Sequence, residues 1–486
     1  MKGWETMEDN LRNALTILYR LSGKNGRNLQ MPGDPRYQPE KLKPYLGYDQ
    51  WAGWLILVEW FWMKVLALIG VMPKEDAKLL TDELLIKMLF LITTTKQDAK
   101  EREPGINHDI LALLALMRVF LPMRLHRWLH FCATSYDIIN TAYALQLKVT
   151  FEHVFLPELY ELDELWRYRI GENAEVLMAG RTHLQTALPV TAGFWLANLH
   201  NRYVNSARRL TVLSKEVPGK FSGAVGTSAS QRALIKDRWG EKILMDFLEL
   251  PVAEVSTQIA PPEGMARFYS ELVLLSGALA NLGEDTRILQ SSQFGEVVSE
   301  SSSSSAMSHK KSNPIAAENM AGMHVSVIAE FMKVAMTLVS DLQRDLRWSN
   351  VMRSYSAIAV YAFQQILTAK RVLKSMRIDA EKCRKNFDVQ GKLVVAELVH
   401  LFLQREGVPD AHHLVNKEII PIVEASNDGT FIDAVLDYSR EHAEITTDML
   451  RKMTDADIGI DSYLTLPENY LGNAISIAHR EAGNKL

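Results

Sequence analysis

Cysteine is scarce in this sequence, which has two, Cys132 and Cys383, among 486 residues. Two thiols so far apart make no disulfide framework, and they lack the spacing of a metal site. The sequence has no HExxH motif and no glycine fingerprint of a phosphate or dinucleotide site at a strand-to-helix turn. His412 and His413 are adjacent, so they do not face one ligand. We therefore expect no metal and no cofactor, and a protein of the reducing cytoplasm.

The sequence also lacks an excess of charge of either sign. The formal net charge is −4, so no overall field attracts nucleic acid or an anionic membrane. One apolar run, residues 51–73, is long enough to cross a bilayer, but Glu59 and Lys64 lie inside it, where charges are costly. We interpret this run as a buried helix. The first residues carry acids and no apolar stretch, so we expect no signal peptide and neither a membrane nor a nucleic acid as a partner.

Clean period-two alternation is rare, and the apolar pattern is helical almost throughout. In residues 265–290 the apolar positions step by four, three, four and three, which is a heptad-like seam. These positions are Phe268, Leu272, Leu275, Leu279 and Leu282. Similar long runs cover 134–180, 190–215, 315–345 and 354–375. We predict an all-α fold built on a bundle of long helices, and the pattern leaves open whether the seam faces the same chain or another subunit.

The length of the chain suggests about three domains. Changes of pattern near residues 130 and 375 place the boundaries. We predict an N-terminal helical domain over 1–130, a central long-helix domain over 131–375 and a C-terminal helical domain over 376–486.

Four segments hold polar residues that core packing does not explain. They are "NHD" at 107–109, "HFCATSYDIINTA" at 130–142, "AGRTHLQTALPVTAG" at 179–193 and "SESSSSSAMSHKKSNPIAAENMAG" at 299–322. Each has a simple structural explanation when taken alone. Thr134 or Ser135 fits a helix N-cap, His108 fits a satisfied interior histidine, and a run of serines is usually a flexible linker.

Taken together and in this order, the segments resemble the fumarase/aspartase superfamily of lyases, and its adenylosuccinate lyase family in particular. "SSSAMSHKKSNPIAAENMAGM" is similar to the superfamily signature GSSxMPxKxNP. "PRY" at 35–37 and "QRDLRWSNVMR" at 343–353 also resemble adenylosuccinate lyase segments. The resemblance implies three mostly helical domains in a homotetramer, with active sites made from three subunits.

The reaction that the resemblance implies is a β-elimination that releases fumarate. Its base is the first serine of the signature pair, which corresponds to Ser304. Its acid corresponds to His183, oriented by Glu318. The family's substrate-binding residues correspond to Arg36, Tyr37, His108, Asp109, Thr134, Ser135, Thr182, Gln185, Ser228, Lys310, Asn313, Arg344, Ser349 and Arg353. A mobile loop would suit the serine run, because such loops close over substrate and reopen.

The chain departs from the family pattern in the signature. Ser303 and Ser308 replace a glycine and a proline, and one extra residue precedes Asn313. The extra residue leaves Ser305 as an alternative base and Lys311 as an alternative to Lys310. Ser228 stands where the family often has glutamine, and "LQTALPVT" leans toward the cycloisomerase branch. The alternatives are another succinyl adduct, a muconate-type substrate, or a structural protein that reuses the fold without catalysis.

Overall fold

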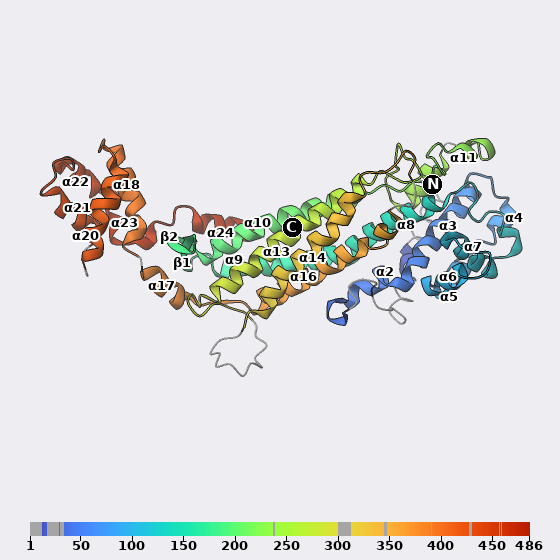
Figure 1. The fold of residues 1–486 in the computed structure, drawn as a ribbon, viewed down its shortest axis with the longest axis horizontal. Helices are drawn as coiled ribbons and strands as arrows, with labels where there is room; N and C mark the ends of the chain where they lie inside the picture. The colour runs from blue at the N-terminus through green and yellow to red at the C-terminus, as the bar shows by residue number, and fades with distance from the viewer. Residues whose placement is uncertain are drawn as a thin grey trace. The chain divides into compact units, whose positions relative to one another are not determined.

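The computed structural model describes residues 12–16, 29, 34–236, 239–299, 313–344, 348–389, 391–426, 430–455, 457 and 459–486. Helices account for most of these residues, and the described ranges hold two sheets of two strands each (Figure 1). The predicted all-α fold is therefore confirmed.

The chain forms two compact units, and each unit is assembled from three separate segments. Unit 1 comprises Met1–Glu161, Asn205–Ala280 and Met320–Thr368, and unit 2 comprises Leu162–Val204, Asn281–Asn319 and Ala369–Leu486. The division into domains at residues 130 and 375 stays a prediction.

Unit 1 contains the helices of the N-terminal segment and several short helices from later in the chain. These are α2 (Lys43–Leu46), α3 (Trp51–Leu68), α4 (Lys74–Ala77), α5 (Asp82–Leu91), α6 (Thr94–Glu101), α7 (Asp109–Phe120), α8 (Ser135–Thr150), α11 (Ala229–Leu234), α12 (Gly240–Leu248) and α15 (Ser349–Met352). Short 3-10 helices lie at η1 (Pro35–Tyr37), η2 (Glu40–Leu42), η3 (Tyr48–Gln50) and η4 (Met123–Leu125), and a π-helical turn, η5 (Phe151–Phe155), follows α8.

Five long helices begin in one unit and end in the other: α9 (Leu156–Glu172), α10 (Ala192–Leu213), α13 (Glu263–Leu289), α14 (Ile315–Met336) and α16 (Tyr355–Ser375). Unit 2 adds strands β1 (Leu177–Thr182), β2 (Gln185–Thr191), β3 (Val297–Val298) and β4 (Arg377–Ile378). Its helices are α17 (Ala380–Asp388), η6 (Leu393–Val395), α18 (Ala396–Arg405), α19 (Ala411–Leu414), η7 (Val415–Ile419), α20 (Ile420–Ala425), α21 (Phe431–Ser439), α22 (Thr447–Met453), α23 (Asp461–Thr465), η8 (Pro467–Asn469) and α24 (Ala474–Ala482).

Helix α3 is the apolar run that the sequence analysis interpreted as a buried helix. By length and composition the stretch Tyr48–Leu68 could cross a membrane, but 78% of its apolar window is buried inside the protein. Glu59 is fully buried, and its carboxylate accepts hydrogen bonds from the backbone N–H of His130 at 3.1 Å and from His130 Nδ1 at 2.6 Å. The charge inside the run is thus satisfied by the protein, and the interpretation as a buried helix is confirmed.

The predicted seam on α13 lies inside the chain. Each of its five apolar residues is at most 4% exposed, so the seam is covered by other parts of the same chain. This outcome resolves the alternative that the sequence left open.

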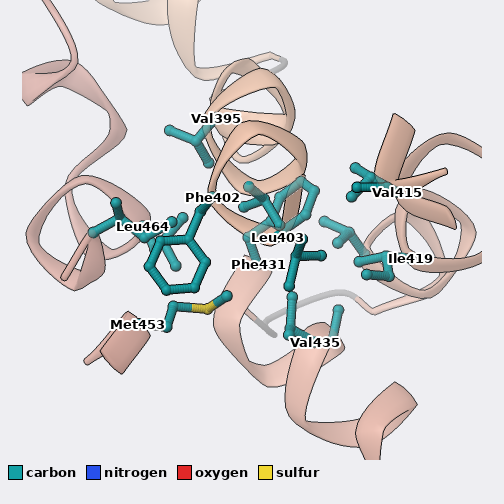
Figure 2. Close-up of a cluster of buried hydrophobic side chains, with 14 of the residues drawn as sticks. Val395, Phe402, Leu403, Val415, Ile419, Phe431, Val435, Met453 and Leu464 are labelled. Carbon is teal, nitrogen blue, oxygen red and sulfur yellow. The ribbon is translucent and has the colours of Figure 1, made fainter. Parts of the chain in front are cut away.

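The C-terminal part of unit 2 has a hydrophobic core of its own. Side chains from α18, η7, α21, α22 and α23 point toward one another, as Figure 2 shows. Each of these helices buries one apolar face, which is the pattern of amphipathic helices around a shared core. Helix α21 begins at a capping box in which Thr430 and Asp433 satisfy each other's backbone N–H groups.

Candidate active site

The N-terminus of α8 carries two of the predicted site residues, Thr134 and Ser135. Thr134 is the N-cap, and its backbone N–H donates to Asp137 Oδ2 at 2.8 Å in a capping box. The simple interpretation of Thr134 as a cap is therefore confirmed. A cap does not exclude a role at the site, because the cap also fixes the direction in which the neighbouring Ser135 is presented.

Asp137 connects this helix end to the glycine-rich loop at 219–230. Lys220 Nζ donates to Asp137 Oδ1 at 2.5 Å, and both side chains are fully buried. The backbone N–H groups of Ser222 and Gly223 donate to the same carboxylate at 3.1 and 3.2 Å. Buried charges need this kind of pairing and hydrogen bonding. The pair thus fixes the loop that leads to Ser228 against the N-terminus of α8.

The same loop presents Ser228 in a conformation that non-glycine residues rarely adopt. Ser228 has φ 54° and is the N-cap of α11, and its N–H donates to the carbonyl of Ser222 at 2.7 Å. Gly226 has φ +80°, and a Cβ there would lie 2.0 Å from the carbonyl oxygen of Ser256. The loop therefore approaches its neighbour closely at Gly226.

Four predicted site residues from three distant segments meet in unit 1. His108 Nε2 lies 3.4 Å from Ser135 Oγ, and His108 Nδ1 lies 3.4 Å from Asp109 Oδ1. Arg353 Nη2 donates to Asp109 Oδ2 at 2.9 Å. His108 is about half exposed, with 46% of its side chain accessible, so it is not the satisfied interior histidine of the alternative interpretation. The cluster offers an imidazole, a hydroxyl and a guanidinium to a ligand.

A pocket of about 530 Å³ lies beside this cluster in unit 1, and Asp109 and Arg353 belong to its lining. Its size is typical of a site for a small molecule. Aromatic side chains form much of the wall, and Trp51 stacks on Tyr143 with ring centroids 4.3 Å apart. We call this space the unit 1 pocket.

The predicted phosphate-side residues lie elsewhere in unit 1. Arg36, in η1, forms a bidentate ion pair with Asp34, and the hydrogen bond to Asp34 raises the pKa of Arg36. Arg344 has φ 81° and donates to Met352 Sδ at 3.6 Å. Ser349 opens α15. Tyr37 ends η1. A role for these residues at the substrate stays a prediction.

In unit 2, Thr182, His183 and Gln185 form the tip of a β-hairpin. Thr182 pairs with Gln185, so His183 and Leu184 are the two residues of the turn. Their φ angles are 54° and 62°. Two-residue hairpin turns of this kind favour Asn-Gly, and side chains that adopt them without glycine are strained. The predicted acid thus occupies a strained and exposed tip, which is a common feature of functional residues.

An ion pair behind the hairpin joins it to the segment that precedes the serine run. Arg181 Nη1 donates to Glu296 Oε2 at 2.9 Å and Nη2 to Oε1 at 2.5 Å, and Glu296 is fully buried. Asn386 Nδ2 donates to Glu296 Oε1 at 2.7 Å. A bidentate arginine–carboxylate pair gives geometric precision as well as energy. It therefore positions β1 relative to β3.

Two predicted residues lie near the start of α14, Asn313 before the helix and Glu318 within it. The carbonyl of Asn313 accepts a hydrogen bond from the N–H of Ile315 at 2.9 Å, and Glu318 lies in the first turn of the helix with its side chain exposed. The described chain contains no hydrogen bond between Glu318 and His183, so the orientation of His183 by Glu318 stays a prediction. Ser304, Ser305, Lys310 and Lys311 lie outside the described residues.

Sequence reasoning missed Lys220, Arg181 and Glu296 as positioning residues. Lys220 and its partner Asp137 are 83 residues apart in sequence. Arg181 and Glu296 pair with each other across 115 residues, so no local pattern predicts either pair. The one local signal is a lysine inside the glycine-rich loop at 219–230. Among the described residues, no group of three or more His, Cys, Asp or Glu side chains is placed to hold a metal ion.

Comparison with known proteins defines the class. A family model described as a lyase matches residues 67–329. The solved structure of a fumarate lyase from Mesorhizobium sp. BNC1 has the same fold, with a TM-score of 0.75 and 22% identity over 94% of this chain and 100% of that one. A 3-carboxy-cis,cis-muconate lactonizing enzyme from Pseudomonas putida gives a TM-score of 0.71 and 24% identity over 89% and 94%. The chain belongs to the fumarase/aspartase superfamily of lyases.

Within this class, the chain is similar to adenylosuccinate lyases. It is 30% identical to the adenylosuccinate lyase of Archaeoglobus fulgidus, over 91% of this chain and 96% of the relative. It is also 26% identical to the N-acetyl-S-(2-succino)cysteine lyase of Dickeya dadantii, over 84% and 86%. The relatives therefore include lyases named for different substrates.

Proposed function

We propose that the protein is a C–N lyase that releases fumarate from N6-succinyl-AMP and from the succinyl-aminoimidazole carboxamide ribotide of purine synthesis, in the cytoplasm. The observation that carries this proposal is the cluster of His108, Asp109, Ser135 and Arg353 beside the unit 1 pocket. The similarity to adenylosuccinate lyases over nine-tenths of the chain supports the same conclusion.

In the proposed reaction, Ser304 or Ser305 removes a proton from the carbon next to a carboxylate. The electron pair left on carbon is delocalised into that carboxylate, which gains negative charge. Lys310 or Lys311 and Asn313 stabilise this charge, because positioned cations and donors act most strongly where charge develops.

The C–N bond then breaks, fumarate forms, and the departing nitrogen takes a proton from His183. Glu318 orients His183 in this proposal. Arg36, Tyr37, Arg344, Ser349 and Arg353 hold the phosphate side of the nucleotide. His108, Thr134, Ser135, Thr182, Gln185 and Ser228 complete the contacts to the substrate.

We further propose that the active protein is a homotetramer with composite sites. The exposed face of α14 supports this, because Val325, Ile328, Met332 and Met336 recur at helical spacing and are 67%, 41%, 54% and 61% exposed. Contiguous apolar surface of this kind marks an interface. The hairpin tip is also exposed, and Leu184 there is 58% accessible, as expected for a tip that reaches another subunit.

A second candidate is a lyase for another succinyl adduct. Ser228, in place of the glutamine often found in the family, and the similarity to an N-acetyl-S-(2-succino)cysteine lyase favour it. The test is an assay of purified protein with N6-succinyl-AMP, followed by ultraviolet absorbance, beside a parallel assay of fumarate release from N-acetyl-S-(2-succino)cysteine. We expect turnover of the nucleotide. Turnover of the cysteine adduct alone would replace the proposal with this second candidate, and His183→Ala controls for contaminating lyase.

A further inference from the structure

The hairpin of β1 and β2 in unit 2 is anchored at its base and exposed at its tip. At the base, Ala179 is 2% exposed and belongs to the C-terminal hydrophobic core, and α17 packs against β1. At the tip, the four residues Thr182–Gln185 are all exposed. Arg181 lies between these two parts, and only 10% of its side chain is accessible. The direction of the tip, and with it that of His183, is therefore set at Arg181.

A β-bulge separates the base of the hairpin from its tip. The register shifts between Ala179 and Arg181, so two residues of β2 stand opposite Gly180. A Cβ at Gly180 would lie 2.6 Å from a carbonyl oxygen of β2, so the two backbones approach too closely there for a larger residue. A bulge interrupts the ladder and bends the strand. The pairing of β1 with β2 alone therefore does not fix the tip relative to the base.

The ion pair of Arg181 with Glu296 supplies the missing restraint. The guanidinium bonds to both oxygens of the fully buried carboxylate, which fixes its orientation as well as its distance. Glu296 is itself held at its backbone, because its N–H donates to the carbonyl of Leu289 and its carbonyl accepts from the N–H of Asp379, each at 2.9 Å. Asn386, on α17, donates to the same carboxylate at 2.7 Å.

We infer that Arg181, Glu296 and Asn386 are positioning residues that control the rate of the reaction through His183, because they hold the exposed tip in the direction that presents this residue to the leaving nitrogen. The inference rests on the proposed function for the role of His183 as the acid. Reacting groups need precise placement, and a misplacement of about 1 Å can lower a rate about a hundredfold. The three residues should therefore affect kcat, and only while His183 is present. A pair that merely stabilised the fold would add its effect to any loss at His183.

The test is Arg181→Lys, which keeps a positive charge beside Glu296 but loses the planar fork that bonds both carboxylate oxygens. We expect kcat with N6-succinyl-AMP to fall about ten- to hundredfold. KM should change by less than about twofold, because the loss concerns the transition state. In the His183→Ala background, Arg181→Lys should lower kcat no further, since residues that act as a unit are not additive.

Arg169→Lys is the matched control for this substitution. Arg169 also lies in unit 2, 16% of its side chain is accessible, and it bonds to Glu172 and to two backbone carbonyls of α16. The substitution removes a comparable set of bonds away from the hairpin, so kcat should stay at the wild-type value.

The outcomes separate this inference from the proposed function. A loss in Arg181→Lys that adds fully to the loss in His183→Ala, or an unchanged kcat in a folded Arg181→Lys, would overturn the inference and leave the proposed reaction in place. Near-normal turnover of His183→Ala would instead refute the proposed acid, on which the inference rests.

Two further arms keep the test decisive. If circular dichroism shows that Arg181→Lys does not fold, Asn386→Ala replaces it. This variant removes one hydrogen bond to Glu296 and should lower kcat about three- to tenfold, again with no further loss in the His183→Ala background. If the wild type cleaves only N-acetyl-S-(2-succino)cysteine, the same variants are compared on that substrate. The same pattern there would support the inference and refute the proposed substrate, and additive losses would overturn both.

Discussion

At the scale of single residues, His183 combines an exposed position with a strained backbone. Its φ of 54° lies in the left-handed region, in a turn without glycine. Such a conformation persists because the paired strands and the Arg181–Glu296 ion pair hold the turn from behind. The arrangement favours a residue that is presented to a ligand rather than one that stabilises the fold.

We expect His183→Ala to lower turnover by about two to four orders of magnitude, because a departing nitrogen needs a proton from a general acid. The free energy of unfolding and the helical circular dichroism should not change, since the side chain is exposed. Steady-state kinetics with N6-succinyl-AMP measures the effect. His413→Ala, an exposed histidine on α19, is the matched control. Near-normal turnover of His183→Ala would remove this residue from the mechanism.

The residues that the sequence could predict are those in recognisable local motifs. His108, Asp109, Ser135 and Arg353 were expected at one site, and the structure brings them together. Lys220 could not be predicted, because a buried lysine has no local signature and its role depends on Asp137, 83 residues earlier. The ion pair between Arg36 and Asp34 could not be predicted from the sequence either, although the two residues are close along the chain.

At the scale of elements, the long helices were predictable and the hairpin was not. Repeats of three and four residues persist over many turns in α13, so the apolar pattern was clear. Strands β1 and β2 have six and seven residues, too few for a convincing alternation, and their turn lacks the Asn-Gly signal of a hairpin.

Helix α24 is attached to the rest of unit 2 by a buried histidine. His200 is fully buried, and its Nε2 and Nδ1 bond to Asp163 at 3.0 Å and Glu481 at 2.8 Å. Arg167 also bonds to Asp163 and to the carbonyl of Ala482. Burial alone would lower the pKa of His200, but the hydrogen bonds that its imidazole donates to the two carboxylates raise the pKa above its ordinary value. The imidazole therefore holds α24 best when it is protonated.

The sign of the pH effect follows from these shifts. Because the pKa of His200 is raised, this residue stabilises the attachment of α24 fully below about pH 6.5. The contribution is lost as the pH rises through the pKa of His200 in the folded protein. Burial raises the pKa values of Asp163 and Glu481, but their hydrogen bonds with His200 outweigh burial, so both pKa values are lowered. The stability that these two carboxylates contribute is lost as the pH falls below about 4.5. The attachment should be strongest between these limits.

We therefore expect the hydrogen-exchange protection factors of the α24 amides to fall as the pH rises above about 6.5, the ordinary pKa of histidine, while those of α18 in the same unit stay constant. The fall should be about tenfold for each pH unit between the unfolded and folded pKa values of His200. Protection factors are used because the intrinsic exchange rate itself rises with pH. In His200→Asn the protection of α24 should no longer vary over this range. Equal pH dependence in the variant would show that another group controls the helix.

At the scale of the whole molecule, the exposed apolar face of α14 bears on whether the protein acts as a single chain or as an assembly of several copies. Val325, Ile328, Met332 and Met336 project from one face of the helix, and Val339 and Leu342, just beyond its end, are 73% and 89% exposed. Elsewhere the chain buries its seam on α13 completely. A chain that covers one seam and exposes another has a surface suited to further copies of itself.

We expect Met332→Glu to convert the proposed tetramer into smaller species, because a charge at the centre of an apolar interface cannot be buried without a partner. Sedimentation velocity measures the assembly, and Val119→Glu, at an exposed position on α7, is the matched control. Turnover should fall together with the mass of the assembly if each site needs residues from several subunits. A wild-type chain that sediments as a monomer at micromolar concentration would contradict the interface. A fully active dissociated variant would instead contradict the composite site, because the predicted residues of unit 1 and unit 2 would then have to act within a single chain.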